Sequence, residues 1–488
     1  MTDAAPAASV AETHSAVVFF VGDRAYKLKK PVDLGFLDFR ARASREAVCH
    51  REVELNRRLS PDVYLGVADV LGPDGEVCDH LVVMRRMPQD RRLSTLVERG
   101  ERVEGHLWDL AHLIASFHSR AERSAAADAA ASPGALAGRW RDNSASLEAS
   151  VPVVDGAAVE RVHALAMRYL DGRHPLFDRR QAEGRACDGH GDLLADDVFC
   201  LPDGPRVLDC IEFADELRYG DTLADVAFLA MDLERLGRPE LGELFLRAYR
   251  IHADDVWPAS LGHHHIAYRA QVRAKVTAIR ARQGHAPSVP EARRLLAIAA
   301  DHLEAARVRL VMVGGLPGTG KSTVAGAIGD ALEATVLRSD EVRKELAGLP
   351  VDRPAPDEFG RGIYAAEATA GTYRELLSRA GVALGMGETV VLDASWGDEV
   401  RRAQARALAA RACADLVELR CEVATEVAAE RMRARAAAGG GPSDATPAIA
   451  AAMAAVADPW PEATTIGTDG PPSVSLAKGL DAVASPAR

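Results

Sequence analysis

Two runs with the residue types of strands stand within residues 15–30, on either side of the Gly22-Asp23 pair. A Gly-Asp pair between two such runs favours a tight turn, so the pattern predicts a β-hairpin. A charged amphipathic helix is predicted over residues 45–59, where Ser60-Pro61 would stop it, and a short apolar strand over residues 80–87. The chain therefore opens on a sheet.

Helical periodicity follows this sheet. Leu110, Leu113 and Phe117 recur three to four residues apart, which predicts a helix over residues 107–118. The tract 124–138 is rich in Ala, Ser, Pro and Gly and is interpreted as a loop or a fraying helix. Further helical patterns continue to about residue 305, so strands come first and helices follow.

A different pattern begins after residue 305. Residues 309–314 form an apolar run that leads into a glycine-rich turn, and two more apolar runs, 388–393 and 415–421, alternate with helical segments. Strands that alternate with helices indicate a parallel sheet. The predicted fold class is therefore an α+β protein-kinase-like two-lobed domain followed by an α/β P-loop NTPase domain with a parallel sheet.

Length and composition agree with two domains. A chain of 488 residues is too long for one hydrophobic core, and 48% apolar with 27% charged residues is ordinary for a globular protein. The predicted domains are residues 1–305, with lobes at about 12–90 and 91–305, and residues 306–488. A formal net charge of -12 argues against general binding to nucleic acid or anionic membranes. Without a signal-like start or a long apolar run, a cytoplasmic location is expected.

The glycine-rich turn matches the phosphate-binding pattern G-x4-G-K-[ST] and stands between a strand and a helix. Such glycines let backbone N–H groups converge on phosphate oxygens, while the lysine contacts the β- and γ-phosphates and the hydroxyl residue binds Mg²⁺. ATP and Mg²⁺ are the implied cofactors, and Lys321 is also a predicted catalytic residue. The predicted nucleotide-binding residues are Gly315, Leu316, Pro317, Gly318, Thr319, Gly320, Lys321, Ser322 and Thr323.

Four side chains after this loop favour a kinase. Asp340 is placed where the second strand would end and could accept a proton from a substrate hydroxyl, although a helix cap alone is an alternative. Asp393 ends an apolar strand and is a candidate to hold Mg²⁺ or substrate. Arg431 and Arg435 share one helical face and could close over the transferring phosphate, or form a solvated basic face. Residues 310–470 resemble small P-loop kinases of the gluconate-kinase, polynucleotide-kinase and zeta-toxin types, which implies these roles.

A second set of acidic residues lies in the N-terminal region. The segment HGDLLADD, residues 190–197, has the spacing of a kinase catalytic loop, with Asp192 to orient the acceptor hydroxyl and Asp197 to bind Mg²⁺. Asp209 and Glu212 follow after a strand and are further candidate metal ligands. An acidic turn with capping aspartates is the structural alternative. Lys27 in the hairpin and Glu52 in the 45–59 helix could form the ion pair found in kinases.

These segments resemble aminoglycoside-phosphotransferase-like and choline-kinase-like proteins over about residues 12–285. The resemblance rests on the segments ETH (12–14), AYKLKKPVDLGFLDF (25–39), REVELNRRLSPDVYLGV (51–67), HGDLLADDV (190–198), LDCIEFADELRYGDTLADVAFLAMDLE (208–234) and YRAQVRAKV (268–276). With the fused P-loop region it is similar to a two-domain group of bacterial ATP-binding proteins. The resemblance implies that Lys27 binds phosphate with Glu52 as its partner and that Asp192 is the catalytic base.

The sequence departs from that resemblance at three points. Asp197 stands where an asparagine is usual, and no G-x-G-x-x-G pattern covers the phosphate site. Of the two candidate metal ligands after the strand, Glu212 fits the local pattern better than Asp209 and is the first choice. The basic helix 268–282 could receive an anionic substrate or the other domain, or could simply be solvated.

The predicted function is transfer of the γ-phosphate of ATP to a hydroxyl group of a small molecule, by two kinase-type domains. One alternative is a P-loop kinase or ATPase in which the N-terminal domain is a degenerate sensing or binding module. Another is a switch that hydrolyses ATP to water.

Overall fold

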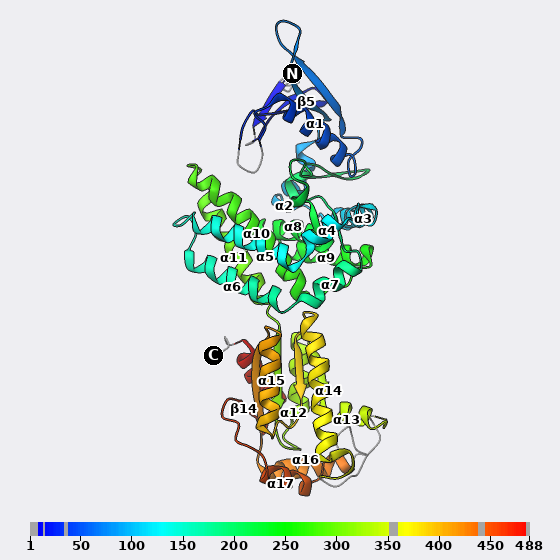
Figure 1. Cartoon of the computed structure of the whole chain (residues 1–488), viewed down its shortest axis with the longest axis vertical. Helices are drawn as coiled ribbons and strands as arrows, with labels where there is room; N and C mark the ends of the chain where they lie inside the picture. Colours follow the sequence, from blue (N-terminus) through cyan, green and yellow to red (C-terminus); the bar gives the residue numbers. More distant parts are fainter. Residues whose placement is uncertain (1–7, 13–14, 34–37, 351–359, 438–444, 485–488) are drawn as a thin grey trace. The chain divides into compact units, whose positions relative to one another are not determined.

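The computed structural model describes residues 8–12, 15–33, 38–350, 360–437 and 445–484, which form two compact units (Figure 1). The first unit consists of Met1–Ala164, Phe177–Trp257 and Gly262–Leu303, and the second of Leu165–Leu176, Pro258–Leu261 and Glu304–Arg488. Among the described residues, no helix combines the length and the apolar character that crossing a membrane requires.

The first unit begins with an antiparallel sheet of order β1-β2-β3-β5-β4. The predicted hairpin is confirmed, with Gly22 at the turn in the left-handed region (φ +58°). The resemblance segments at the start of the chain extend into residues 13–14 and 34–37, which lie outside the described residues. The five strands are β1 Ala8–Glu12, β2 Ala16–Val21, β3 Arg24–Lys29, β4 Tyr64–Leu71 and β5 Val77–Arg85.

Helix α1, Arg42–Asn56, covers one face of this sheet. Cys49 and Val53 are buried in a core that also contains Ala25 and Val82 from the strands. Glu52 lies next to Val53 in the same helix and is fully buried, so its carboxylate is carried into the interior towards β3. The packing of α1 thus determines the place of the predicted ion pair.

The rest of the first unit is mainly helical. The 124–138 tract is not a loop: Ser124 Oγ accepts a hydrogen bond from the amide of Ala127, and Ser132 Oγ from that of Ala135, so two capped helices form. Two short strand pairs, β6 Ala186–Asp188 with β9 Tyr219–Asp221 and β7 Val198–Leu201 with β8 Gly204–Val207, flank the 190–197 segment. The helices are α2 Leu93–Glu98, α3 Glu104–Arg120, α4 Ala125–Ala131, α5 Pro133–Glu148, α6 Gly156–Asp171, α7 His174–Ala182, α8 Thr222–Arg235, α9 Pro239–Ala253, α10 Ala259–Arg282 and α11 Ser288–Ala305.

The second unit contains the predicted parallel sheet, with the order β11-β12-β10-β13-β14 and every neighbouring pair parallel. The strands are β10 Arg309–Gly314, β11 Thr335–Arg338, β12 Val390–Asp393, β13 Asp415–Glu422 and β14 Thr464–Gly467. The helices are α12 Lys321–Leu332, α13 Ser339–Leu346, α14 Ala366–Gly385, α15 Glu399–Arg411, α16 Thr425–Ala437, α17 Pro447–Ala455 and α18 Pro472–Ala484.

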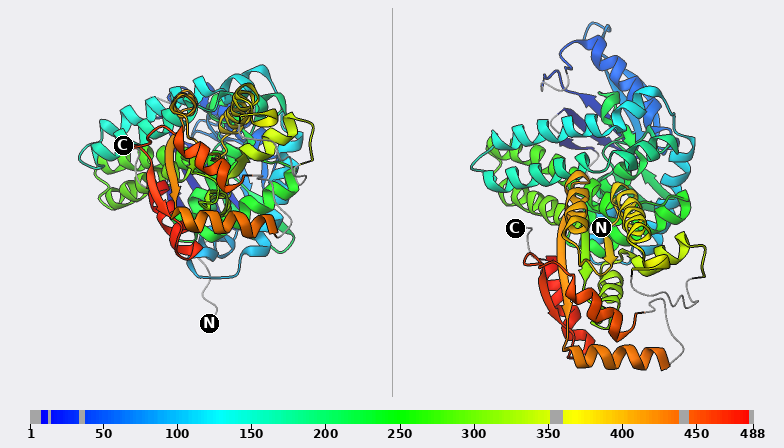
Figure 2. Two further views of the ribbon diagram at one scale, coloured as in Figure 1. Left: turned by 90° about the horizontal axis from the view of Figure 1, so that it is seen from below. Right: turned by 60° about the horizontal axis from the view of Figure 1, so that its bottom comes forward.

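Strand β10 lies at the centre of the sheet and is buried on both faces. Val311 and Val313 pack with Val324 and Ile328 of α12, while Leu310 and Met312, which point to the opposite face, are also fully buried. Helices α14 and α15 run alongside the strands, and α16 lies crosswise at one end of the sheet (Figures 1 and 2). That end is the carboxyl edge, where ligands bind in open parallel sheets.

Candidate functional site

The phosphate loop connects β10 to α12 at the carboxyl edge of the sheet. Gly318 adopts φ +82°, and a Cβ atom placed on it would come within 2.5 Å of the carbonyl oxygen of Ala428 in α16, so only glycine fits. The hydroxyl of Thr319 donates to the carbonyl of Leu316 at 2.8 Å and closes the turn. The loop therefore presents backbone N–H groups and the amino end of α12 to an anion, as the motif predicts.

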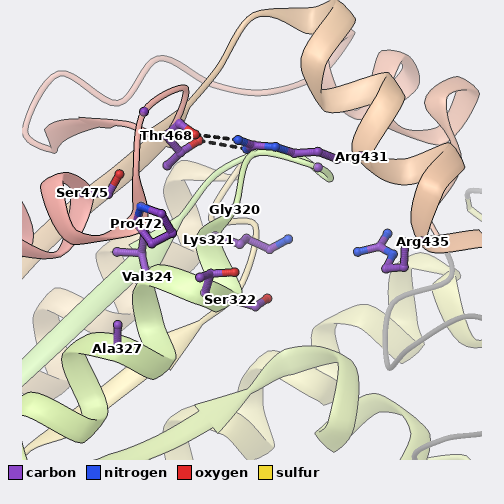
Figure 3. A pocket seen from close by; sticks show the side chains of 13 residues that line it. Gly320, Lys321, Ser322, Val324, Ala327, Arg431, Arg435, Thr468, Pro472 and Ser475 are labelled. Carbon is purple, nitrogen blue, oxygen red and sulfur yellow. Dashed lines mark hydrogen bonds between the residues drawn. The ribbon is translucent and has the colours of Figure 1, made fainter. Parts of the chain in front are cut away.

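A cavity of about 370 Å³ lies beside this loop. Figure 3 shows the side chains of Lys321 and Arg435 pointing towards each other across it. Its lining residues are Gly318, Gly320, Lys321, Ser322, Thr323, Val324, Ala327, Arg431, Arg435, Thr468, Gly470, Pro472 and Ser475. Five of the nine predicted nucleotide-binding residues and both predicted arginines therefore line one cavity, whereas Gly315, Leu316 and Thr319 line a neighbouring pocket and Pro317 lines neither.

Six of these lining residues were missed by sequence reasoning. Val324, which is buried, and Ala327, which is half-buried, come from α12, and the other four come from the segment after β14. One signal was available, because a Gly- and Pro-rich turn directly after the last strand of a parallel sheet falls at the ligand-binding edge. The missed residues are Val324, Ala327, Thr468, Gly470, Pro472 and Ser475.

The two arginines of α16 have different environments. Arg431 donates to the carbonyl oxygen of Thr468 at 2.6 Å and to its hydroxyl at 3.3 Å, and that hydroxyl donates to the carbonyl of Thr319 at 2.6 Å. Arg431 thus ties α16 to the loop after β14 and to the phosphate loop. Arg435 forms no hydrogen bond or ion pair with the part of the chain that the structure describes, so its guanidinium is available to a ligand.

If the cavity holds the phosphates of a nucleotide, replacing Arg435 by alanine should lower the rate of phosphoryl transfer roughly 30-fold, because a free cation facing those phosphates is lost. The melting temperature should stay unchanged, since Arg435 holds no neighbour. Arg431→Ala is the matched comparison and should instead lower both nucleotide affinity and the melting temperature. Steady-state kinetics and thermal melts of the two variants check this, and identical behaviour of both would contradict the division of roles.

Asp393 ends β12 below the phosphate loop and is 4% exposed. Burial raises the pKa of its carboxyl, and Lys321 and a hydrogen bond from Ser322 oppose that rise. Its Oδ1 atom is buried without a hydrogen-bond partner among the described residues. An unsatisfied carboxylate oxygen beside a hydroxyl matches the oxygen ligands that Mg²⁺ prefers, so Ser322 and Asp393 fit the ion.

Asp340 lies in the first turn of α13 and is half-buried. Its negative charge contributes to the raised pKa of Asp393, which places the two carboxylates near each other. The helix-cap alternative is wrong, because the N-cap residue of α13 is Arg338 and no side chain caps this end. Asp340 makes no hydrogen bond or ion pair with the described residues, so its carboxylate is free to meet a substrate.

In the first unit, the predicted kinase ion pair is present. Lys27 Nζ lies 2.9 Å from Glu52 Oε1 and 2.5 Å from Asp209 Oδ1. Burial lowers the pKa of Lys27, but attraction to Asp209 and Glu52 more than compensates and raises it well above its usual value. Lys27 in turn holds the pKa of Asp209 at about 2. A charged lysine therefore joins the α1 glutamate to the acidic segment after β8.

A second lysine takes part in this network. Lys29, two residues along β3 and therefore on the same face as Lys27, is buried and lies 2.6 Å from Glu52 Oε2. It also contacts Glu212. Each of the two candidate metal ligands therefore has a lysine partner, Asp209 with Lys27 and Glu212 with Lys29, and these ion pairs do not decide between them.

The 190–197 segment is held by Asp225 of α8, whose carboxylate accepts hydrogen bonds from the amides of His190 and Gly191, each at 2.8 Å. Burial raises the pKa of Asp192 to about 6. Burial and the charge of Asp209 raise the pKa of Asp197 well above its usual value. The carboxylates of Asp197 and Asp209 repel each other, and a divalent cation bound between them would relieve this repulsion. The two residues therefore fit Mg²⁺. Three or more metal-ligating side chains gathered around one point were not found in the described ranges.

Comparison with known proteins identifies relatives of the whole chain and of its parts. A family model described as an AAA domain matches residues 310–460. The proteins Rv2004c of Mycobacterium tuberculosis strain H37Rv and Mb2027c of Mycobacterium bovis are each 46% identical over 467 residues, which cover 96% of this chain and 93% of the relative.

Both kinds of enzyme in the resemblance also occur among similar solved structures. A gluconokinase from Sinorhizobium meliloti 1021 is 19% identical, with a TM-score of 0.26, over 36% of this chain and 91% of that chain. The GDP complex of aminoglycoside 2'-phosphotransferase-IIIa is 16% identical, with a TM-score of 0.38, over 60% and 92%. A choline/ethanolamine kinase family protein from Mesorhizobium loti is 15% identical, with a TM-score of 0.39, over 61% and 92%. On the match along nearly its whole length, this chain belongs to the family of the mycobacterial protein Rv2004c.

Proposed function

We propose that the P-loop unit is an ATP-dependent kinase that phosphorylates a hydroxyl group of a small molecule. The phosphate loop and Lys321 bind the β- and γ-phosphates, and Asp340 orients the acceptor hydroxyl and takes its proton. Bound Mg²⁺, held by Ser322 and Asp393, would neutralise charge on the phosphates. Arg435 contributes a further positive charge as the γ-phosphoryl group is transferred.

The observation that carries this proposal is the free carboxylate of Asp340 beside Asp393 and the phosphate loop. A switch that only hydrolyses ATP needs a group to position water, whereas transfer to an alcohol needs a base that accepts the hydroxyl proton, and the half-buried, unpaired carboxylate of Asp340 suits that role. The site therefore supports transfer to an acceptor more than simple hydrolysis.

Asp340→Asn should lower acceptor-dependent ADP release about 100-fold, the usual contribution of a positioned general base, while ATP affinity stays within about twofold. ADP release measured with and without a mixture of small hydroxyl compounds checks this, with titration calorimetry for ATP affinity. Asp330→Asn, an exposed aspartate in α12, is the matched control. Fast ADP release without any acceptor, unaffected by Asp340→Asn, would favour the ATP switch instead.

We also infer that the first unit is a second kinase site. The ion pair from Lys27 to Glu52 and its contact with Asp209 support this, because a domain that had lost phosphoryl transfer would have no need to keep a desolvated lysine between two carboxylates. In that site Asp192 would receive the proton of the acceptor, and Asp197 and Asp209 would hold Mg²⁺. A degenerate binding module remains the competing function, and the nucleotide stoichiometry considered in the Discussion separates the two.

A further inference from the structure

Helix α10 carries a row of arginines beside the 190–197 segment of the first unit, called the catalytic segment from here on. Arg269 Nη1 donates to the carbonyl oxygen of Gly191, the residue before Asp192, at 3.3 Å. Arg273 stands four residues further along α10, and residues four apart lie on one helical face, roughly 40° from each other around the axis. The contact of Arg269 therefore places this face, with Arg273, at the catalytic segment.

A second polar row fixes the rotation of α10. Gln271 Nε2 donates to Ser144 Oγ at 2.9 Å, and Lys275 Nζ donates to Asn143 Oδ1 at 2.7 Å, so this row is bonded to α5. Two residues along a helix correspond to a rotation of about 200°, which directs the arginine row away from α5. Arg273 is therefore held towards Asp192 by contacts on the far side of its own helix.

The two arginines differ in what they already bind. Arg269 Nε donates to the carbonyl of Ala224 at 2.8 Å, and its guanidinium lies 4.7 Å from the centre of the Phe228 ring, so it is part of the scaffold. Arg273 is half-buried and has neither a hydrogen bond nor an ion pair within the described ranges. Burial raises the pKa of Asp192, and Arg273 is the cation that opposes this rise most strongly.

Two other acidic groups near Asp192 are paired with cations. Asp209 is bound to Lys27 at 2.5 Å, and Asp232 of α8 to Arg235 at 2.6 Å. Arg273 forms no ion pair with any described carboxylate, and Asp192 is the carboxylate on which its charge acts. A partly desolvated cation without a paired carboxylate is stabilised when a ligand supplies a negative charge.

We propose that the acceptor of the first unit carries an anionic group, a phosphate or a carboxylate, which Arg273 binds while the acceptor hydroxyl faces Asp192. The proposal rests on the second kinase site inferred above. In the reaction the hydroxyl oxygen bonds to the γ-phosphorus, the bond from that phosphorus to the bridging oxygen breaks, ADP leaves with the electron pair, and the hydroxyl proton passes to Asp192.

Binding of an anion can be tested without turnover. Inorganic sulfate is titrated by calorimetry, at constant ionic strength, into the full chain carrying Lys321→Ala, which weakens binding at the phosphate loop. Adding Arg273→Gln should weaken sulfate binding roughly tenfold, the effect of a lost charge-assisted hydrogen bond, and Arg273→Lys should restore part of it. Arg282→Gln is the control, because Arg282 is exposed and nine residues along the helix, on the opposite face.

Equal sulfate affinity of the Arg273→Gln and Arg282→Gln variants, both with native circular dichroism, would overturn the proposal, as would absence of sulfate binding to the Lys321→Ala chain. A second experiment compares ADP release by the Lys321→Ala chain with glucose 6-phosphate, glucose and glucosamine, which share hydroxyl groups but differ in charge. A preference for the anionic sugar that Arg273→Gln removes supports the proposal, and a preference for glucosamine contradicts it. Arg273-dependent sulfate binding without ADP release from any sugar would support the anion site and count against the kinase activity.

Discussion

Replacing Lys321 by alanine is expected to weaken Mg²⁺-ATP binding by the P-loop unit about 1000-fold, which is effectively a loss of that site. The lysine faces the 370 Å³ cavity and would contact two phosphates, and two charge-assisted hydrogen bonds contribute about 4 kcal/mol together. Titration calorimetry gives the stoichiometry directly. Two equivalents bound by the wild type and one by the variant would show that both units bind nucleotide.

The control for this experiment is Lys478→Ala, an exposed lysine of α18, which should bind like the wild type. Asp192→Ala should leave the P-loop site intact, because Asp192 belongs to the other unit. One equivalent in the wild type and none in Lys321→Ala would identify the first unit as a degenerate kinase fold. Equal loss from Lys321→Ala and Asp192→Ala would contradict two independent sites.

Replacing Arg180 by methionine should destabilise the first unit by about 3–5 kcal/mol, since two buried carboxylates would lose their shared cation. The guanidinium of Arg180 in α7 bonds Asp221 at 2.5 and 2.8 Å and Asp255 at 3.0 and 2.9 Å, and all three side chains are buried. Asp221 also caps α8 through the amide of Leu223, so the pair holds the helix that carries Asp225. Hydrogen exchange of the α8 amides measures this loss.

A matched substitution compares the buried ion pairs of Arg180 with an exposed ion pair. Arg85 pairs with Asp62 at 3.1 Å, but both side chains are 40% exposed or more, so Arg85→Met should cost less than about 1 kcal/mol. If Arg180→Met were equally mild, the carboxylates of Asp221 and Asp255 would be protonated or hydrated in the native protein, and their ion pairs with α7 would not organise the 190–197 segment.

The parts of the site that sequence predicts best are those whose residues are contiguous. The phosphate loop needs only its own glycines and the flanking strand and helix, so Lys321 and Ser322 could be placed without a structure. Thr468 could not, because it reaches the cavity through the register of β14 beside β13, which no local pattern specifies. The order of the strands decides which loop faces the nucleotide.

The choice of a metal ligand between Asp209 and Glu212 shows a second limit of prediction from the sequence. Both follow the same strand, and the local pattern favoured Glu212. Asp209 adopts φ +64°, a conformation rare outside glycine, and this turn brings its carboxylate to Lys27. Residue types alone do not predict this turn at Asp209. The two-residue spacing of Lys27 and Lys29, however, could have indicated that the two lysines share one face of the strand. The helices in the 124–138 tract were likewise signalled by Ser124 and Ser132, whose capping role is masked by the surrounding alanines.

Residues 468–475 form one wall of the cavity, and this has a consequence for the synthesis of the protein on the ribosome. The ribosome synthesises the phosphate loop well before this segment, and β14 must then join the edge of a sheet whose other strands already exist. A nascent chain that has emerged only to α17 has phosphate-binding glycines but an incomplete pocket. If this cavity binds a nucleotide, its full set of contacts forms late in biosynthesis, and the full stabilisation by the ligand is reached only once Ser475 has left the exit tunnel.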